Sequence, residues 1–449
     1  MTAAASATPP PGGPLAERLR AKLQAQQAAP AGARAPQPVP PEHYDFARFP
    51  ELREYTNTRW YYDNQGFAWN MFREHEGVAS ALTRMDGREV VNFSSFNYLD
   101  LAGDARVRAA AKQAIDTYGT STGSSRQIMG EIPVFGEFER ELAAALGVED
   151  ALLSVGGYGA NAFTIAYLAR PRQDLILYDE LVHNSALMGC RASGARRIAY
   201  PHDDGDALER LLAELRHQFE RVLILTEGAF SMDGDIPDLP RLVEIKHRHK
   251  ALLMVDEAHS VGLIGPNGMG IADHYGLPGS AIDVNFATLS KSFSTTGGYV
   301  AGRRELITML KHYGPGVSLY STAPAPATAA TALEALRVMR AEPERRRRAL
   351  ANAAHFRACA RAAGLDVGRS AGTGVVPLMI GDGELALWLA AQLFEQGVFA
   401  FPMLHPVVPR NEARLRFFVS AAHTEVQIER AVALIGELKA SAPPSKGIL

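Results

Sequence analysis

Apolar strand segments alternate with amphipathic helical segments between about residues 104 and 330, and this alternation restricts the fold more than any other feature. The strand candidates are residues 151–155, 175–178, 197–200, 222–226, 252–256, 282–288 and 298–302. Such a pattern is typical of a mainly parallel sheet with helices on both faces. The sequence therefore predicts an α/β large domain with a seven-stranded sheet and ligands at the carboxyl ends of its strands.

Lys291 stands between two of these apolar segments, in the stretch ATLSKSFS at 287–294. Burial without a partner lowers the pKa of a lysine, and the resulting neutral amine attacks aldehydes to form Schiff bases. The alternative is a surface lysine whose stem lies along apolar neighbours. The residues at the other strand ends decide between these interpretations.

Asp256 ends the apolar segment 252–256 and is followed by Glu257 and His259. A carboxylate there can pair with the pyridinium nitrogen of pyridoxal phosphate (PLP), an aldehyde cofactor that bonds to lysine. His259 can reach the phenolic oxygen of the same ring. Alternatively, Asp256 and Glu257 cap a helix and supply its acidic first turn.

A glycine-rich turn, GGYG at 156–159, follows the first strand candidate and precedes a helix predicted over 162–168. Backbone N–H groups at a helix N-terminus bind anions, so we assign Gly157 and Tyr158 to the cofactor phosphate, with the Thr288 hydroxyl as a third donor. The spacing lacks the third glycine of the dinucleotide-binding fingerprint.

His183 follows the apolar segment 175–178 at the same predicted sheet edge. Its imidazole can stack on the cofactor ring, although a single loop histidine is also often structural.

Seven motifs in order resemble the α-oxoamine synthase family of fold-type I PLP enzymes, over about residues 85 to 440. They are NFSSFNYL at 92–99, GSSR at 123–126, GYGAN at 157–161, TEGAFSMDGD at 226–235, VDEAHS at 255–260, TLSK at 288–291 and RLR at 414–416. The family includes 8-amino-7-oxononanoate synthase, serine palmitoyltransferase, 5-aminolevulinate synthase and 2-amino-3-ketobutyrate CoA ligase.

The resemblance implies a decarboxylative condensation of an α-amino acid with an acyl thioester, carried by CoA or an acyl carrier protein. The products are an α-amino ketone, CO2 and a free thiol. In this chain it implies that Lys291 holds PLP and moves the α-proton, and that Asp256 pairs with the pyridinium. His183 stacks on the ring, while His259 and Ser231 contact its phenolic oxygen.

The resemblance also assigns residues to the substrate and to a second subunit. Asn97 and Arg416 would bind the amino-acid carboxylate, because a guanidinium offers two parallel N–H donors. Asn97 as a turn cap is the alternative to the first assignment, and Arg414 on the same strand face competes with Arg416. Ser321 and Thr322 would reach the phosphate of a neighbouring subunit, which predicts a homodimer with active sites at the interface.

Two stretches depart from the family pattern. Residues 403–409 read MLHPVVP, without the arginine of the Arg-Pro-Pro run found in some members, which weakens a specific assignment to the serine palmitoyltransferase or oxononanoate synthase branch. Gly156 also replaces a serine that is usual before the phosphate-binding glycine.

Composition and segment patterns predict the domain organisation. We expect a disordered Ala/Pro-rich extension over 1–42, in which Leu15, Leu19 and Leu23 allow a short amphipathic helix. An aromatic-rich segment and a hairpin with its turn at 85–88 follow over 43–103. The PLP-binding large domain covers 104–330. A smaller C-terminal α+β domain covers 331–449, with a linking helix to about residue 348 and strands over 375–380, 398–401 and 415–419.

Length, charge and cysteine content exclude several classes of protein. The chain has 449 residues, 47% of them hydrophobic, and a net charge of −3, which argues against a nucleic-acid partner. Cys190 and Cys359 have no metal-ligand spacing, so we predict no metal site and a reducing, cytoplasmic location. No apolar run is long enough for a membrane span.

Three other functions remain open at this stage. A serine palmitoyltransferase-like or glycine C-acetyltransferase-like member would keep the same chemistry. Within the same fold, an aminotransferase or an aldolase would act without a thioester. A PLP-fold binding protein without catalysis is the alternative from another class.

Overall fold

The computed structural model describes residues 38–65 and 71–444. The predicted extension over 1–42, including the helix around Leu15, Leu19 and Leu23, falls largely outside the described residues. The chain divides into two units, residues 1–69 and 70–449. In the first unit, Asp45 caps a short helix by accepting a hydrogen bond from the Ala47 N–H at 3.0 Å. The helices of this unit are η1 Pro41–His43, η2 Phe46–Arg48 and α2 Pro50–Gln65.

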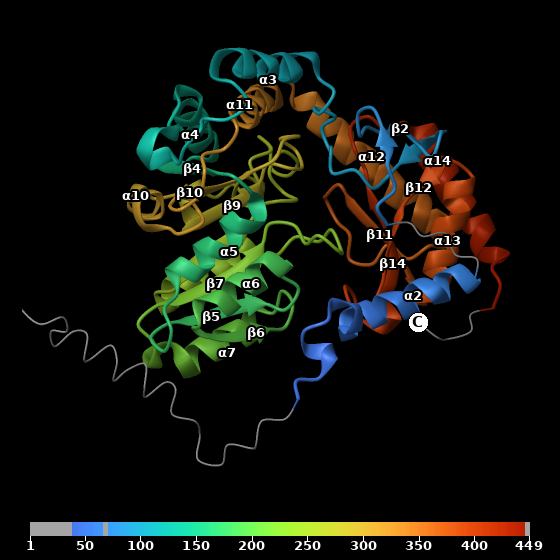
Figure 1. Ribbon diagram of the computed structural model, residues 1–449, viewed down its shortest axis with the longest axis horizontal. Helices are drawn as coiled ribbons and strands as arrows, with labels where there is room; N and C mark the ends of the chain where they lie inside the picture. The colour runs from blue at the N-terminus through green and yellow to red at the C-terminus, as the bar shows by residue number, and fades with distance from the viewer. Residues whose placement is uncertain (1–37, 66–70, 445–449) are drawn as a thin grey trace, which may run out of the picture. The chain divides into compact units, whose positions relative to one another are not determined.

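A seven-stranded sheet forms the centre of the second unit (Figure 1). Its strands are β4 Asp150–Ser154, β5 Leu175–Asp179, β6 Arg196–Tyr200, β7 Val222–Glu227, β8 Leu252–Asp256, β9 Val284–Thr288 and β10 Gly298–Gly302. Their spatial order is β4-β10-β9-β8-β7-β5-β6, and only β10 runs antiparallel to its neighbours. The predicted seven-stranded, mainly parallel sheet is therefore confirmed, with β9 beginning two residues later than predicted.

Alternate residues of each strand enter two separate apolar cores, one on each face of the sheet. Leu175, Leu177 and Ile224 belong to one core, whereas Ile176 and Leu223 belong to the other. Helices cover both faces, as expected for strands that are apolar on both sides. The helices are α3 Ala105–Tyr118, α4 Pro133–Leu146, α5 Gly157–Leu168, α6 Asn184–Ser193, α7 Gly205–Leu215, α8 Leu239–His249, α9 Ile271–His274, α10 Arg304–Tyr313 and α11 Pro326–Ala341, with the short η3 Arg126–Gly130, η4 Arg216–Gln218 and η5 Gly279–Ala281.

The C-terminal part builds its own core on a three-stranded antiparallel sheet, ordered β11-β14-β13. Phe356, Phe417 and Leu389 are fully buried there. Its elements are α12 Pro343–Ala362, β11 Val375–Gly381, α13 Gly383–Glu395, β12 Val398–Phe399, β13 Phe401–Met403, η6 Arg410–Glu412, β14 Ala413–Phe418 and α14 Glu425–Ala440. The strand predicted over 398–401 is thus divided between two sheets.

The predicted hairpin is present and joins the C-terminal part. Its strands β2 (Leu82–Met85) and β3 (Arg88–Asn92) are connected by Asp86 and Gly87, both with positive φ, as a tight hairpin turn requires. Strand β1 (His75–Glu76) extends the sheet, and β12 pairs with β3 in parallel on the other side.

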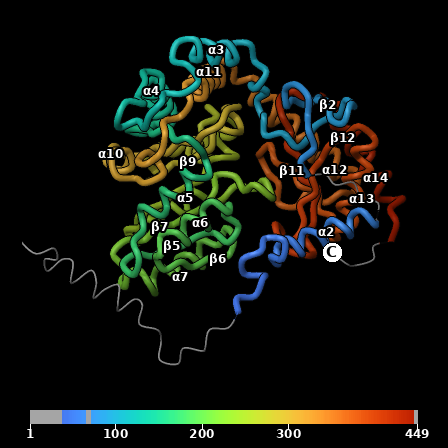
Figure 2. Tube along the Cα trace, viewed as in Figure 1, coloured from blue at the N-terminus to red at the C-terminus, as the bar shows by residue number. Residues whose placement is uncertain are grey.

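The single long helix predicted up to about residue 348 is wrong. Helix α11 ends at Ala341, and α12 begins at Pro343. Glu342 between them has φ −121° and ψ 65°, because a residue before proline avoids the helical region. The trace in Figure 2 shows the chain passing from α11, beside α3, into α12 at this break.

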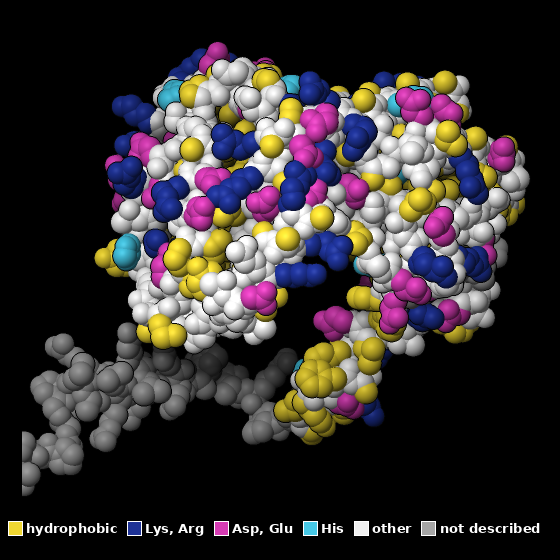
Figure 3. Space-filling view, turned by 90° about the horizontal axis from the view of Figure 1, so that it is seen from above, with side chains coloured by type: hydrophobic (Ala, Val, Ile, Leu, Met, Phe, Trp, Pro, Cys, Tyr) yellow, Lys and Arg dark blue, Asp and Glu magenta, His cyan; other side chains and the backbone are white. Residues whose placement is uncertain are grey.

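Among residues 38–65 and 71–444, no helix has the length and apolarity needed to cross a membrane. On the face drawn in Figure 3, Lys and Arg side chains are interspersed with Asp and Glu. This mixture of charges agrees with the small net charge of −3.

Candidate active site

A cavity of about 310 Å³ lies where the ends of β7, β8 and β9 meet the first turns of α5 and α6. It brings together most of the residues predicted for the site. The predicted lining residues are Gly157, Tyr158, His183, Ser231, Asp256, His259, Thr288, Lys291 and Arg416. Asn97, Arg414, Ser321 and Thr322 do not line this cavity.

Asp256 is held by two hydrogen bonds that leave it facing the cavity. Its Oδ1 accepts from the Ala258 N–H at 3.0 Å, and its Oδ2 accepts from Asn161 Nδ2 at 3.0 Å. Residues 258–260 form a turn rather than a helix, so Asp256 does not cap a helix as the alternative proposed. Burial raises the pKa of Asp256 to about 6, and a cationic ring nitrogen beside it would favour the ionised carboxylate again.

Lys291 follows β9 and reaches the same cavity. Burial lowers the pKa of its amine to about 8, against the opposing charges of Asp256 and Glu227. A larger fraction of the amine is therefore neutral near neutral pH than for a lysine in water, as Schiff-base formation requires. Its Nζ lies 5.7 Å from the centre of the Phe96 ring.

His259 is buried and paired with a residue that the sequence did not single out. The Tyr98 Oη and His259 Nδ1 atoms lie 2.8 Å apart. Burial lowers the pKa of His259 well below its usual range and raises that of Tyr98, so both groups are neutral.

His183 caps α6, because its Nδ1 accepts a hydrogen bond from the Ser185 N–H at 3.2 Å. The structural role left open for this residue is therefore present, and its ring lines the cavity as well. With Nδ1 as acceptor, the ring proton is on Nε2. Burial, followed by the charges of Lys291 and Arg416, lowers the pKa of His183 and keeps it neutral.

At the phosphate end of the predicted site, the first residue of α5 lies close to the last residue of β9. A side chain on Gly157 would place its Cβ 2.6 Å from the Thr288 Oγ1 and 3.2 Å from the Gly297 carbonyl oxygen. Helix α5 begins at Gly157, earlier than predicted, so the first turn of α5 lies beside the Thr288 hydroxyl. This is a suitable cradle for an anion.

Arg416 and Arg414 differ sharply although both lie on β14. Arg414 is 2% exposed, and its guanidinium pairs with Asp233 at 2.7 Å and Glu412 at 2.9 Å. Arg416 lines the cavity and donates from Nη1 to the Ser231 carbonyl at 3.1 Å. Within the described part of the chain its buried Nε has no hydrogen-bond partner. The geometry therefore favours Arg416 for binding an anion.

Asn97 uses its amide to cap its own turn and to hold that turn to two other segments of the chain. Its Oδ1 accepts from the Leu101 N–H at 2.9 Å and from Ser294 Oγ at 2.9 Å, while Nδ2 donates to the Ala79 carbonyl at 3.1 Å. These contacts match the turn-capping alternative, and its carboxylate-binding role stays a prediction.

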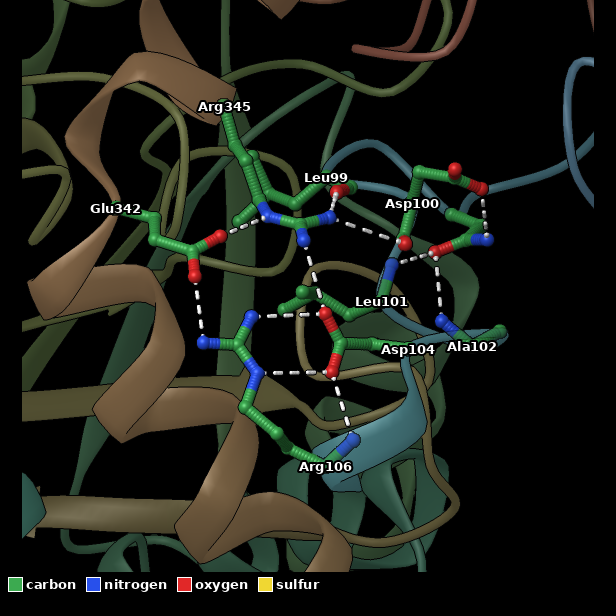
Figure 4. A network of polar contacts seen from close by, with 9 residues as sticks. Leu99, Asp100, Leu101, Ala102, Asp104, Arg106, Glu342 and Arg345 are labelled. Carbon is green, nitrogen blue, oxygen red and sulfur yellow. Dashed lines mark hydrogen bonds and ion pairs between the residues drawn. The ribbon is translucent and has the colours of Figure 1, made fainter. Parts of the chain in front are cut away.

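Charged side chains fix this loop to the start of α12 (Figure 4). Arg345 donates to the carbonyls of Leu99 and Asp100 and to the Asp104 carboxylate, the last at 2.8 Å. Arg106 bridges Asp104 and Glu342, and its hydrogen bonds to Asp104 help to lower the pKa of that carboxyl to about 2. The network holds the loop that carries Phe96, Asn97 and Tyr98.

A second, larger cavity of about 770 Å³ adjoins the first. The two share Phe96, Ser290, Lys291 and Arg416. The aromatic side chains of the larger cavity are Phe72, Phe96, Phe399, Phe401 and Phe418, and Asn97 lies on its wall. Such a surface suits an apolar group brought up to Lys291.

Several residues of the site could not be found as such from the sequence. Glu227, buried opposite Asp256 on the neighbouring strand, accepts from the His183 N–H at 2.6 Å. Burial and the Asp256 charge raise its pKa well above the usual range. Glu227, Tyr98 and Asn161 each lie within one of the seven family motifs. Membership of a motif was the one feature of the sequence that pointed to them.

The buried Asp256, the cavity-facing Lys291 and the Gly157 cradle fit PLP, and together with the fold they define a fold-type I PLP-dependent enzyme. The chain matches the family described as aminotransferase class I and II over residues 88–435. A serine palmitoyltransferase from S. paucimobilis, solved with PLP bound, superposes with a TM-score of 0.84 at 27% identity, over 88% of this chain and 99% of that chain.

Relatives with established names narrow this class. The chain is 41% identical to an 8-amino-7-oxononanoate synthase from Thermoanaerobacter pseudethanolicus, over 78% of this chain and 87% of the relative. It is 42% identical to a synthase of the same name from Symbiobacterium thermophilum, over 79% and 89%. The chain belongs to the α-oxoamine synthase family of PLP-dependent acyltransferases. Although residues 403–409 contain no arginine, the chain as a whole is about 40% identical to proteins with the oxononanoate synthase name.

Proposed function

We propose that this enzyme condenses a small α-amino acid with an acyl thioester and releases CO2, a free thiol and an α-amino ketone. The observation that carries the proposal is the pair of adjoining cavities that share Lys291 and Arg416. The smaller cavity, about 310 Å³, would hold PLP, and the amino acid would lie beside it where the two cavities meet at Lys291 and Arg416. The larger, apolar cavity suits the acyl group.

The names of the relatives agree with this chemistry. In 8-amino-7-oxononanoate the amine-bearing carbon is bonded directly to a ketone carbon. A decarboxylative condensation makes this arrangement, because the acyl carbon takes the place of the amino-acid carboxylate.

PLP, when bound, supplies a ring that withdraws negative charge from the amino-acid α-carbon. Gly157, Tyr158 and Thr288 would hold its phosphate, and Asp256 would hold its ring nitrogen. His183 and His259 would fix the ring plane and its phenolic oxygen. Arg416 would bind the amino-acid carboxylate with charge-assisted hydrogen bonds.

The neutral amine of Lys291 would take the α-proton. A bond then forms between the α-carbon and the thioester carbonyl carbon, and the carbon–sulfur bond breaks to release the thiolate. The bond to the carboxylate breaks next and CO2 leaves. Lys291 returns its proton to the α-carbon.

A carboxyl-labelled amino acid tests the reaction directly. We expect labelled CO2 from one of glycine, alanine or serine only when an acyl-CoA or an acyl carrier protein thioester is present. Lys291→Ala should release none. Formation of a keto acid without any thioester would instead identify an aminotransferase, and an aldehyde from a hydroxyamino acid would identify an aldolase.

We also propose that two subunits complete each active site. Ser321 and Thr322 do not line the cavity of their own chain. The exposed apolar side chains Ile128, Met129 and Tyr320, which are 84%, 71% and 87% exposed, support a subunit contact around this turn.

Mixing two inactive variants distinguishes a shared site from a self-contained one. Lys291→Ala and a Ser321→Ala/Thr322→Ala double variant should each have little activity, whereas co-expressed mixed dimers should regain one functional site. An active, monomeric wild type in sedimentation would contradict the dimer.

A further inference from the structure

Three metal-ligating side chains of different types meet on the C-terminal part, where α12 packs beside α14. His355 and Cys359 are four residues apart and therefore lie on one face of α12, and Glu429 comes from α14. Their candidate ligand atoms all lie within 4.8 Å of one another. None of the three lines either cavity of the active site.

The distances within this group suit a tetrahedral ion. Zinc bonds of about 2.3 Å to sulfur and about 2.0–2.2 Å to nitrogen and oxygen place neighbouring ligand atoms roughly 3.2–3.6 Å apart. In the structure, Cys359 Sγ lies 3.5 Å from His355 Nε2, and that nitrogen lies 3.1 Å from Glu429 Oε1. The remaining pair, the Cys359 sulfur and a Glu429 oxygen, lies within 4.8 Å, so the three side chains can close around an ion.

We propose that His355, Cys359 and Glu429 form a binding site for a zinc-like divalent cation that links α12 to α14. Sulfur, imidazole nitrogen and carboxylate oxygen are the three ligand types that zinc takes from proteins. The His355 and Glu429 side chains are 30% and 57% exposed, so water can supply the fourth ligand. His355 and Cys359 on α12 and Glu429 on α14 already lie close together without the metal.

Two carboxylates, those of Glu429 and Glu425, act on the Cys359 thiol. Burial, followed by the charges of Glu429 and Glu425, raises the pKa of Cys359. A divalent ion reverses this effect, because it favours the thiolate and neutralises the carboxylates. Binding would release the thiol proton and would weaken as the pH falls.

The consequence for the protein is structural. The inner faces of α12 and α14 already share one apolar core, in which Phe356 and Ala360 join Ile428 and Ile435. A metal bridge on the outer side would hold the same two helices together. A cation that binds only the folded state raises the melting temperature in proportion to the logarithm of its concentration.

Cobalt(II) is the probe for the experiment, added to the PLP-loaded, full-length protein without an affinity tag. We expect ligand-field absorption at longer wavelengths than PLP, with one ion per chain and displacement by zinc. Cys359→Ser should remove the thiolate-to-cobalt band, and His355→Ala should weaken binding at least tenfold. Cys190→Ser is the matched control, because Cys190 is fully buried elsewhere and should leave the cobalt spectrum unchanged.

Alkylation of the wild type keeps the test independent of variant folding, and thermal melting adds a second readout. Zinc should protect Cys359 from alkylation, mapped by mass spectrometry, and should raise the melting temperature of the wild type but not of Cys359→Ser. A cobalt spectrum without a thiolate band, or alkylation unaffected by zinc, would mean that the group is only a histidine–glutamate ion pair beside a thiol. Either result overturns the proposal whether or not the condensation is confirmed.

Discussion

The Tyr98 hydroxyl and the His259 Nδ1 are 2.8 Å apart, and both side chains are buried, with His259 at the wall of the active site. Burial keeps the phenol protonated and the imidazole neutral, so Nδ1 accepts from the phenol in the tautomer that carries the ring proton on Nε2. Tyr98 thus sets the hydrogen-bonding character that His259 presents to the cavity.

Tyr98→Phe should change the cofactor environment while keeping the packing. The phenyl ring keeps its contact with Phe418, whose ring centre is 6.0 Å away, but His259 Nδ1 is left buried and unpaired. We expect a loss of about 1–3 kcal/mol in the free energy of unfolding. The visible absorbance of bound PLP should also shift, because the histidine beside its phenolic oxygen is no longer held in one tautomer.

Denaturant unfolding and the spectrum of the PLP-loaded protein check the two effects separately. His259→Asn, which removes the ring, should change the spectrum in the same direction. An unchanged spectrum in Tyr98→Phe would show that Tyr98 only supports packing.

Arg416 and Arg414 should respond in opposite ways to replacement by alanine. Arg416→Ala should weaken amino-acid binding by at least tenfold, about 1.4 kcal/mol, with little change in stability, because its guanidinium lines the cavity and makes no ion pair with the residues that the structure describes. Arg414→Ala should lower the free energy of unfolding by about 3–5 kcal/mol, since it leaves the buried Asp233 unpaired.

Amino-acid titration of PLP absorbance measures the first effect, and thermal melting measures the second. Arg416→Lys is the graded case, because it keeps the charge but loses the paired N–H donors. Weakened binding in Arg414→Ala at temperatures where it stays folded, with normal binding in Arg416→Ala, would reverse the assignment.

The fold could be predicted because its signal is local. Each strand of the large sheet is a short apolar segment, and their alternation with helices fixes the parallel arrangement. The break at Glu342 has a local cause in Pro343, because a residue before proline avoids the helical region. Local patterns say less about which residues meet.

Residues of the site could be predicted only where they lie in a motif of the family. Tyr98 and His259 are 161 positions apart, and Glu227 meets Asp256 only through the register of β7 and β8. Strand parity could not separate Arg414 from Arg416, since both point the same way. Their difference comes from Asp233, which lies on a distant loop.

His202 should make the free energy of unfolding fall as the pH becomes alkaline. Its Nδ1 lies 3.0 Å from Asp179 and its Nε2 lies 2.6 Å from Asp235. Burial lowers its pKa, but these hydrogen bonds outweigh burial and raise the pKa to about 10. A raised pKa stabilises the fold fully below the usual histidine pKa of about 6.5, and the stabilisation is lost as the pH rises through about 10.

Unfolding of the wild type and of His202→Gln, compared across this range, isolates the effect from other alkaline titrations. The difference in the free energy of unfolding should shrink by on the order of 3 kcal/mol between about pH 6 and pH 10. A difference that stays constant would mean that His202 is neutral in the folded protein.

Gly157→Ala should weaken PLP binding by opening the phosphate cradle. A methyl group at this position would lie 2.6 Å from the Thr288 Oγ1 and 2.7 Å from its Cβ, so α5 must move away from β9. We expect at least a tenfold loss of PLP affinity and a stability cost of about 1–3 kcal/mol. Equilibrium titration of the PLP-free protein with PLP, followed by absorbance, measures the affinity.

Gly159→Ala is the matched control, two residues further along the same helix. Its methyl group would meet only the Phe163 ring, at an ordinary 3.6 Å, and Gly159 does not line the cavity. Because alanine favours a helix over glycine, this variant should gain about 0.4–1 kcal/mol and bind PLP normally. The same chemical change therefore has opposite signs at two neighbouring positions. Equal losses of PLP affinity in both variants would mean that the first turn of α5 tolerates no added bulk anywhere, and that the contact between Gly157 and Thr288 is not what positions the phosphate.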